Sequence, residues 1–377
     1  MGVNFRPAIN LAGDSHDPLL LAFHLPQFHP CPENDAWWGT GFTEWRNVTN
    51  ARPRFPGHIQ PHLPADLGFY DLRLREAREA QSMLARKYGI GGFVYYHYWM
   101  SGRRLLSEPV DRLHESPEEF ALPFALCWAN ESWSRRWDGS EHEVLAHQTY
   151  SADDDRSHLR FLATRMRDAR YIRFDGRPIF LVYRPEALPD AARTTETWRK
   201  EAVREGLGDL FLIAVESSCR HSPDALGFDA SVEFQPSNEH LVERSHLPIG
   251  HRLLNKVRPS RDQSKLTLYD YPALAARASA QDIDSYLRFP GVTPGWDNSP
   301  RRKEWPRILV GSTPTVYEDW LVASLRRRRT DGGNGIVFVN AWNEWAEGNH
   351  LEPDLRNGHA YLEATLRAQS RFVSGGR

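Results

Sequence analysis

The segment Leu19–Asp35, LLLAFHLPQFHPCPEND, distinguishes between the two folds that the hydrophobic pattern of the chain permits. It begins with an apolar run of strand length, and continuous runs of this kind are typical of parallel strands buried on both faces. A doubly wound nucleotide-binding sheet would follow its first strand with a glycine-rich phosphate loop. Here the strand leads into Pro26, Gln27 and His29 instead. The segment therefore favours a barrel, with the open sheet as the alternative.

Seven further apolar runs extend this pattern along the chain. They are Gly91–Trp99, Pro123–Ala129, Pro178–Tyr183, Leu210–Glu216, Asp229–Phe234, a weak run at Gly291–Trp296, and Gly335–Trp342. Helical periodicity is present at Asp71–Tyr88, Asp153–Arg170, Pro189–Gly206, Thr315–Arg329 and Gly358–Val373. Eight alternating strand and helix units make up a (β/α)8 barrel. The predicted fold class is therefore α/β, a single (β/α)8 TIM barrel with long βα loops.

The length of 377 residues fits one such barrel, so residues 1–377 are predicted to form a single domain. Two connections exceed the usual length of loops, Gln27–Ala65 and the stretch from Pro236 to about Tyr271. The first is rich in Trp, His and Pro and is expected to be ordered. The second, residues 237–271 after the sixth strand, is predicted to be an insertion or loop that serves as a lid, as a partner surface or as neither.

Charge and cysteine content exclude several classes of function. The net charge is −2, with 47 basic and 49 acidic residues, so the electrostatic signature of binding to nucleic acid or acidic membranes is missing. The 3 cysteines form no CxxC pair, which argues against a disulfide framework and a Cys zinc site. No apolar run reaches the roughly 18 residues of a membrane helix, and the start has no signal-peptide core, so a cytoplasmic location is expected.

A catalytic metal is not expected from the histidine pattern. His29, His58 and His62 share the first long loop, and Asp66 follows them. The spacing of His58 and His62 suits zinc on a helix, but Pro61 lies between them. We therefore predict neither a metal nor another cofactor.

The chemistry of a (β/α)8 barrel lies at the carboxyl ends of its strands. Here nearly every predicted strand ends in an acidic, amide or aromatic residue. Aromatic rings pack against the CH faces of sugars, while carboxylates and amides bind the hydroxyls. The predicted substrate-binding residues are Gln27, His29, Trp37, Trp38, Glu44, His97, Tyr98, Trp128, Asn130, Glu131, Trp137, Glu233, Gln235, Trp296, Asn343 and His350. For any single Trp, packing in the core is the commoner role.

The sequence NAWNEWAEGNHLEPD, Asn340–Asp354, contains the strongest candidates for catalysis. If the chain becomes helical after the last strand, Glu344 and Glu347 lie on one face, with Cβ atoms roughly 5–6 Å apart. This approaches the ~5–5.5 Å carboxyl separation of retaining glycosidases. Two carboxylates so close resist ionising together, so one pKa is expected to rise and that group to act as the acid. Glu131 together with Glu344 is a rival catalytic pair on two separate strands.

Five motifs in order resemble the WbsX-like family, which is similar to glycoside hydrolase family 99, the endo-acting α-mannosidases and mannanases. The motifs are HLPQFHPCPENDAWWGTGFTEW (His24–Trp45), HIQPHLPADLGFYDLR (His58–Arg73), GFVYYHYW (Gly92–Trp99), LCWANESWSRRWDG (Leu126–Gly139) and the Asn340–Asp354 segment. The resemblance extends from about Leu19 to Tyr361. It implies a (β/α)8 barrel acting on glycans, often in genomic neighbourhoods for surface polysaccharide such as lipopolysaccharide O-antigen.

The resemblance also implies roles for the two glutamates. Glu344 would be the base that removes the proton of the sugar 2-hydroxyl, whose oxygen then attacks C1 to give a 1,2-anhydro sugar with net retention. Glu347 would protonate the leaving oxygen and then activate water. The implied function is a retaining glycoside hydrolase acting on a bacterial polysaccharide or oligosaccharide, with mannose or rhamnose as the candidate sugars.

Two alternatives to hydrolysis stay open. The first is a glycosyltransferase or transglycosylase of surface-polysaccharide synthesis, the label that the family has carried. No convincing D-x-D metal site for a nucleotide-sugar donor is present, only the acidic run Asp153–Asp155 at a predicted helix start. The second alternative is a non-catalytic glycan-binding barrel.

Overall fold

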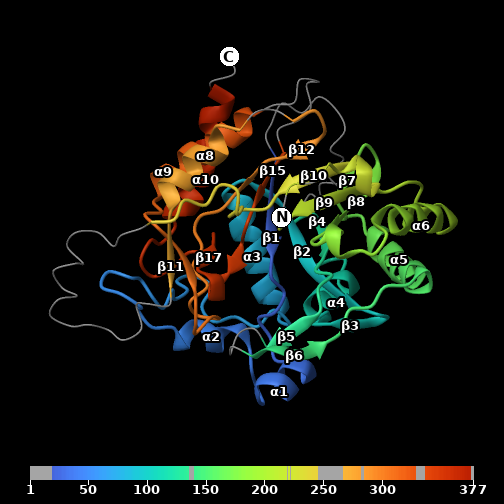
Figure 1. Cartoon of the computed structure of the whole chain (residues 1–377), viewed down its shortest axis with the longest axis horizontal. Coiled ribbons are helices and arrows are strands. Elements are labelled where there is room, and N and C mark those ends of the chain that lie inside the picture. The colour runs from blue at the N-terminus through green and yellow to red at the C-terminus, as the bar shows by residue number, and fades with distance from the viewer. Residues whose placement is uncertain are drawn as a thin grey trace.

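The computed structural model describes residues 19–135, 140–218, 220, 222–244, 266–281, 284–327 and 336–374. A parallel sheet at its centre follows the order β12-β10-β9-β8-β4-β2-β1-β15-β13. These strands are β1 (Leu19–His24), β2 (Ile90–Met100), β4 (Phe124–Trp128), β8 (Arg177–Val182), β9 (Phe211–Glu216), β10 (Ala230–Glu233), β12 (Arg288–Phe289), β13 (Gly291–Val292) and β15 (Ile336–Val339). Helices surround the sheet (Figure 1). Every residue of β4, β9, β10 and β15 is buried, as the continuously apolar runs predict.

The weakest predicted strand closes the barrel. β12 pairs with β10, and β13, which begins two residues after β12 ends, pairs with β15 on the other side. Both pairings are parallel. The two short strands therefore share one barrel position, and together with the seven longer strands they complete eight positions within the described residues. The predicted single (β/α)8 barrel is confirmed.

The five predicted helices are present, with ends shifted by a few residues. They are α3 (Arg75–Lys87), α5 (Ala152–Met166), α6 (Ala191–Arg204), α9 (Pro314–Arg326) and α10 (Ala360–Ser374). The first starts later than predicted because Asp71 and Arg73 form a local turn, in which the Asp71 carboxylate accepts from the Arg73 backbone N–H at 2.9 Å. It ends before Gly89, whose φ of 80° lies in the left-handed region favoured at helix ends.

The remaining helices and strands lie in the connections that join the barrel strands to one another and to the five predicted helices. The helices that the sequence reading missed are α1 (Pro32–Trp38), α2 (Glu44–Asn50), α4 (Glu108–Glu115) and α8 (Tyr271–Ser279). The minor strands are β3 (Arg103–Leu105), β5 (Trp133–Arg135), β6 (Ser140–Ala146), β7 (Arg173–Phe174), β11 (Thr267–Asp270), β14 (Arg307–Val310), β16 (Asn343–Glu344) and β17 (Asn349–His350). The loops after β1 and β4, which carry α1, α2, β5 and β6, lie together at the lower end of the barrel in Figure 1.

The predicted insertion at residues 237–271 is described only at its two ends. Its last part contains β11, which pairs in parallel with β14. Residues 245–265 lie outside the described part of the chain.

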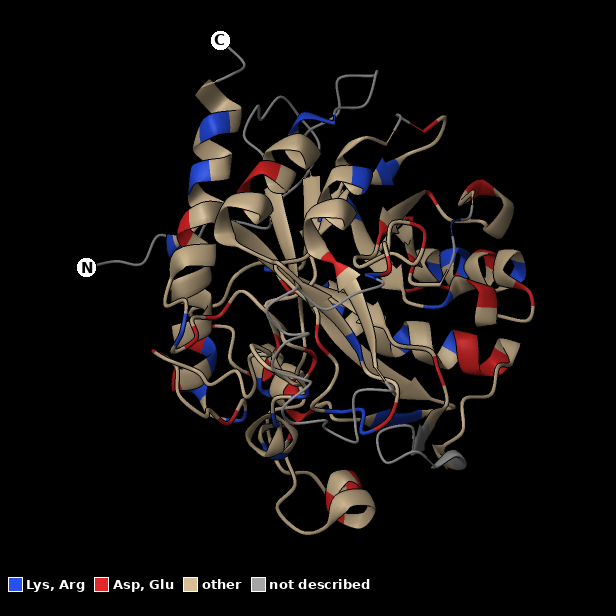
Figure 2. Cartoon of the chain, turned by 60° about the vertical axis from the view of Figure 1, so that its left-hand side comes forward, with Lys and Arg blue, Asp and Glu red and all other residues tan. Residues whose placement is uncertain are grey.

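Acidic and basic positions are interspersed along the outer helices rather than gathered on one side (Figure 2). This distribution agrees with the near-neutral net charge of −2. Among the described residues, none of the helices combines the length and the apolar character that crossing a membrane requires.

The closure of the barrel leads to a testable stability prediction. A Cβ added to Gly291 would lie 2.0 Å from the backbone oxygen of Glu233, so either β10 or β13 must move. A Cβ added to Gly91 would meet only the end of the Leu19 side chain at 2.2 Å, which can rotate away. We expect Gly291→Ala to lower the free energy of unfolding by about 3 kcal/mol. Gly91→Ala, the matched control, should cost clearly less in the same urea titration. Equal losses would contradict the closure described above.

Candidate active site

The loop after the last barrel strand places Glu344 and Glu347 side by side. Glu344 ends β16, and the next three residues, Trp345–Glu347, form a single turn of 3-10 helix rather than the predicted α-helix. Gly348 ends this turn with a φ of 55°, and β17 returns antiparallel to β16. Because a 3-10 turn repeats every three residues, side chains three apart lie on the same side. The predicted pairing of the two glutamates is therefore present through a tighter turn.

Buried hydrogen bonds hold this loop in place. The side-chain oxygen of Asn343 accepts from the Leu25 backbone N–H at 2.7 Å, and its amide donates to the Leu25 carbonyl at 3.0 Å. The Glu352 carboxylate accepts from the Trp345 indole at 2.6 Å and from the Tyr70 hydroxyl at 2.8 Å. Burial raises the pKa of Glu352 to about 7, against the lowering effect of these donors. The loop is thus tied to β1 and to the protein interior.

Arg301 is the residue at the centre of the site, and the sequence reading missed it. Its guanidinium lies 2.9 Å from a carboxylate oxygen of Glu347, 3.0 Å from one of Glu344 and 3.2 Å from one of Glu44. Only 9% of the Arg301 side chain is exposed. The sequence contains many arginines and no motif around this one, so local pattern alone had no means of singling it out.

In this cluster, burial and ion pairing shift the pKa values in opposite directions. Burial raises the pKa of Glu344 to about 8; Arg301 works against this rise, and Glu347 and Glu44 add to it. Burial alone would lower the pKa of Arg301, but the three carboxylates outweigh it and hold that pKa well above its usual value. Arg301 is therefore charged at any working pH. The raised pKa belongs to Glu344, the residue to which the family resemblance assigns the role of base.

A cavity of about 310 Å³ opens directly over this cluster. Its volume lies at the lower end of the range for small-molecule sites. Its lining residues are Leu25, Gln27, Trp38, Tyr96, Tyr98, Ala129, Glu131, Ser132, Trp133, Leu145, Tyr183, Phe234, Arg301, Asn340, Glu344 and Glu347. The wall is mainly aromatic and the floor is charged, which is the arrangement expected for a sugar site. Six of the predicted site residues line it: Gln27, Trp38, Tyr98, Glu131, Glu344 and Glu347.

Polar contacts orient several of these lining residues. The Gln27 amide donates to the Tyr98 hydroxyl at 2.7 Å, which links the first two barrel strands at the cavity. Glu131 pairs with Arg184 at 2.7 Å. The ring of Trp133, an unpredicted lining residue, packs edge-on against Tyr98 with 5.0 Å between centroids.

Four other predicted residues lie next to the cavity without lining it. Trp37 packs against Trp133, and Glu44 is completely buried behind Arg301. Trp296 donates from its indole to Glu347 at 3.0 Å. Asn343 anchors the loop that carries Glu344 and Glu347, as described above. These residues support the cavity from behind.

Most of the other predicted residues that the structure describes are engaged within the protein. His29 and Trp128 are buried in the core, and His97 bonds to His158 at 3.0 Å. Asn130 holds the Arg184 backbone through two bonds of 2.8 Å. Glu233 pairs with Arg288 at 2.7 Å, and Gln235 accepts from the Ser237 backbone at 2.9 Å. His350 faces a second cavity, and Trp137 lies outside the described residues. Polar residues at strand ends therefore anchor loops as well as line the cavity.

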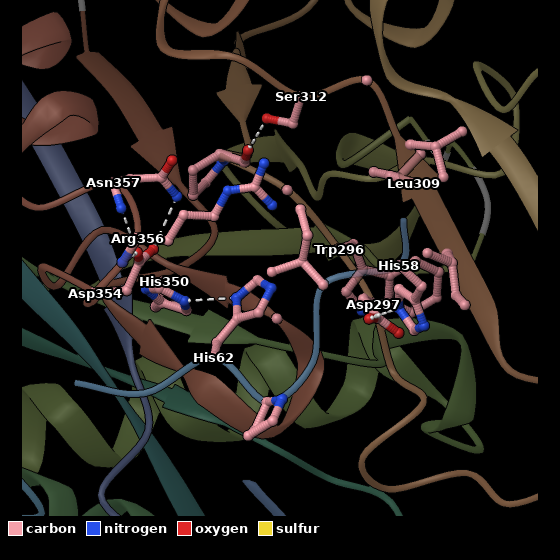
Figure 3. A pocket seen from close by; sticks show the side chains of 18 of the residues that line it. His58, His62, Trp296, Asp297, Leu309, Ser312, His350, Asp354, Arg356 and Asn357 are labelled. Atoms are coloured by element: carbon pink, nitrogen blue, oxygen red, sulfur yellow. Dashed lines mark hydrogen bonds and ion pairs between the residues drawn. The ribbon is translucent and has the colours of Figure 1, made fainter. Parts of the chain in front are cut away.

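A second cavity has a volume of about 320 Å³ (Figure 3). Trp296 and Gly348 are among its lining residues, so the loop that carries Glu347 forms part of its wall. His62 and His350 also line it, and their ring nitrogens lie 2.9 Å apart. Burial lowers the pKa of His350 to about 3 and also lowers that of His62, so both imidazoles are neutral.

Solved structures of glycoside hydrolases share this fold. An endo-alpha-mannosidase of glycoside hydrolase family 99 from Bacteroides thetaiotaomicron aligns with a TM-score of 0.57 at 15% identity, over 95% of this chain and 98% of that chain. A structure described as a glycoside hydrolase-like protein aligns with a TM-score of 0.57 at 14% identity, over 98% and 97% of the two chains. The fold is therefore that of the family 99 glycoside hydrolases.

The chain belongs to the family described as glycosyltransferase WbsX, which matches residues 20–365. It is 46% identical over 354 residues to the protein named WxcX from Xanthomonas campestris pv. campestris strain B100. A second WxcX, from strain ATCC 33913 of the same pathovar, is also 46% identical over 354 residues. These matches cover 93% of this chain and 50% of each relative, so the chain spans about half the length of the curated relatives it matches. Family and fold together point to a carbohydrate-active protein.

Proposed function

We propose that this chain is a retaining glycoside hydrolase acting on an oligosaccharide or polysaccharide, with Glu344 and Glu347 as its catalytic pair. The observation that carries the proposal is the double ion pair of these glutamates with Arg301, at 3.0 and 2.9 Å, in the floor of an aromatic cavity. Both carboxylates thus lie within the span of one guanidinium. A sugar bound above them presents its O2 and its glycosidic oxygen, which are neighbours on the ring, to the two groups at once.

In the proposed reaction no enzyme group bonds to the sugar. Glu344 takes the proton of the 2-hydroxyl, O2 attacks C1, and the C1–O bond to the leaving group breaks as Glu347 protonates the departing oxygen. Glu347, now a carboxylate, removes a proton from water, which opens the 1,2-anhydro ring at C1 while Glu344 returns its proton to O2. Two inversions at C1 give net retention. The negative charge moves from Glu344 to Glu347 in the first step and back in the second, and Arg301, which contacts both carboxylates, stabilises it in either position.

The proposed substrate is an α-linked mannoside or a related sugar such as rhamnose. The structural neighbour is named an endo-alpha-mannosidase, and an axial O2, as in mannose, lies in line to displace an α leaving group from C1. The cavity lining agrees with a neutral sugar, because the guanidinium of Arg301 is already matched by three carboxylates. The same two glutamates would also serve transfer to a sugar hydroxyl in place of water, which is what the description of the family as a glycosyltransferase favours.

The test is incubation of the purified protein with a panel of α-mannosides and mannose- or rhamnose-containing bacterial polysaccharides, with product anomers followed by NMR. Release of a product with retained anomeric configuration is expected. An inverted product would contradict the proposal. A transfer product formed only when an acceptor sugar is added would establish the second function.

The raised pKa of Glu344 leads to a pH prediction with a definite sign. The reaction needs Glu344 deprotonated and Glu347 protonated, so the pair must carry one proton in total. The pair loses its last proton with a pKa of about 8, so kcat/KM should fall above about pH 8 and approach a tenfold loss per unit. Initial rates at low substrate concentration between pH 5.5 and 9 measure this, with circular dichroism at each pH as the folding control. A value of kcat/KM that rises through pH 8 and then levels off would contradict the need for a protonated acid in the pair.

A further inference from the structure

The second cavity contains a cluster that the proposed reaction does not use. His62, His350 and Asp354 each offer one ligand atom, and these atoms all lie within 4.8 Å of one another. His62 comes from the long loop after β1, His350 from β17, and Asp354 from the segment before α10. Figure 3 shows the two rings joined by a dashed line, with Asp354 close to His350. The fold therefore brings His62, from a distant part of the chain, to His350 and Asp354 at one wall of the cavity.

Hydrogen bonds fix the orientation of each of these groups. The His350 Nδ1 lies 2.9 Å from the Glu352 backbone oxygen, and because a carbonyl only accepts, Nδ1 carries the hydrogen. In the neutral ring Nε2 is then a bare acceptor, facing His62 Nδ1 at 2.9 Å. The Asp354 carboxylate accepts from the backbone N–H groups of Arg356 and Asn357 at 2.8 and 2.6 Å. A histidine that donates one ring N–H to a backbone carbonyl and turns the other nitrogen outward has the arrangement typical of a metal ligand.

We propose that His62, His350 and Asp354 bind a divalent transition metal, with zinc as the best fit. Two imidazole nitrogens and one carboxylate, with a further position open to a cavity, form a common three-ligand zinc arrangement. Nitrogens bound to tetrahedral zinc at about 2.0–2.1 Å lie roughly 3.3 Å apart. The ring nitrogens of His62 and His350 are already close to that separation, so the metal replaces the hydrogen between them and the His62 proton moves to Nε2.

The other histidine of this cavity is not part of the cluster. His58 lies 2.7 Å from Asp297 through Nε2 and accepts from the Arg54 backbone N–H through Nδ1 at 2.9 Å. Both of its ring nitrogens are therefore engaged. His58 and His62 share a loop in the sequence, but the structure pairs His62 with His350 and not with His58.

The metal would act on the position of the catalytic loop rather than on the sugar. It would join the loop after β1 to β17, which follows the turn that carries Glu347. The test reads metal binding and not activity, so its outcome is independent of the proposed hydrolysis.

The experiment uses the full chain, free of any affinity tag and stripped of metal by a chelator. Zinc chloride is titrated by calorimetry, and cobalt chloride is titrated with visible absorption as a probe of coordination geometry. We expect one zinc per chain and the intense visible bands of tetrahedral cobalt. His62→Gln is expected to weaken zinc binding by about 100-fold or more.

Two further variants make the result decisive. His58→Gln is the matched control, because it removes a histidine from the same loop and cavity, and its zinc affinity should equal that of the wild type. Asp354→Asn keeps an oxygen for the Arg356 and Asn357 N–H groups but loses the charge, and should also bind more weakly; it decides the question if His62→Gln fails to fold. Absence of zinc binding to the wild type, or equal affinity in wild type and Asp354→Asn, would overturn the site.

Discussion

Replacement of Glu347 by Gln is expected to lower the rate of glycan hydrolysis by about two to four orders of magnitude, the usual contribution of a general acid. Glu347 accepts from Trp296 and Arg301 through separate oxygens, at 3.0 and 2.9 Å, and the single amide oxygen of Gln keeps one of these two bonds. The Gln side chain has the same shape, and Arg301 keeps two carboxylate partners, Glu344 and Glu44. Folding and glycan binding should therefore stay intact. The measurement is kcat/KM on the best substrate of the panel, with the thermal midpoint and a binding isotherm recorded for the same preparation.

The choice of leaving group separates the two glutamates. An aryl glycoside with an acidic phenol as leaving group needs no proton, so Glu347→Gln should retain much of its activity on that substrate. Glu344→Gln should be inactive on both substrates, because the attack of O2 still requires a base. Glu131→Gln is the matched control from the opposite strand end of the same cavity, where Glu131 pairs with Arg184. Hydrolysis by Glu347→Gln at the wild-type rate would contradict the assignment. If Glu131→Gln lost as much activity as Glu344→Gln, the rival pair of Glu131 and Glu344 would be favoured.

Replacement of Arg301 by Met is expected to cause the largest loss of stability. It leaves Glu44, which is completely buried, without the cation that lies 3.2 Å away, and removes the partner of Glu344 and Glu347 as well. Removing one member of a buried ion pair typically costs about 3–5 kcal/mol. We expect a decrease of that size in the free energy of unfolding at pH 7.5, together with loss of activity.

The pH dependence identifies the cause of this loss. Without Arg301 the carboxylates bind protons more readily, so the deficit should shrink as the pH falls toward 5. Urea titrations of wild type and Arg301→Met at pH 7.5 and 5 measure it. Arg356→Gln, at an exposed arginine of the second cavity, is the control and should change stability by less than about 0.5 kcal/mol. A deficit that is the same at both pH values would contradict the role of Arg301 as the counter-charge.

The barrel itself was accessible from the sequence because its signals are local. Runs such as Leu210–Glu216 are apolar throughout, and β9 and its neighbours are buried on both faces as that pattern requires. The weak run at Gly291–Trp296 also marked the correct position. The structure has two short strands there, β12 just before this run and β13 within it. Their pairing with different neighbours depends on long-range closure that no local pattern contains.

The candidate site was accessible only in part. The expectation that functional residues follow the strands selected Gln27, Tyr98 and Glu131, which line the cavity. It also selected Trp128 and Glu233, which do not line it. A polar residue at a strand end can either line the cavity or bind another part of the protein. Which of the two it does depends on its neighbours in space. The partner of Glu233, for example, is Arg288, which is 55 residues further along the chain.

The sequence by itself determined the barrel and the family, and it singled out the two glutamates of the Asn343–Glu347 segment as candidates, because the signals for each are short local patterns in the chain. Only the tertiary structure decided that Arg301 joins Glu44 to that pair, and that His62 meets His350 rather than His58. These contacts join segments more than 40 residues apart. Their energies come from burial and charge pairing, which exist only after the chain has folded.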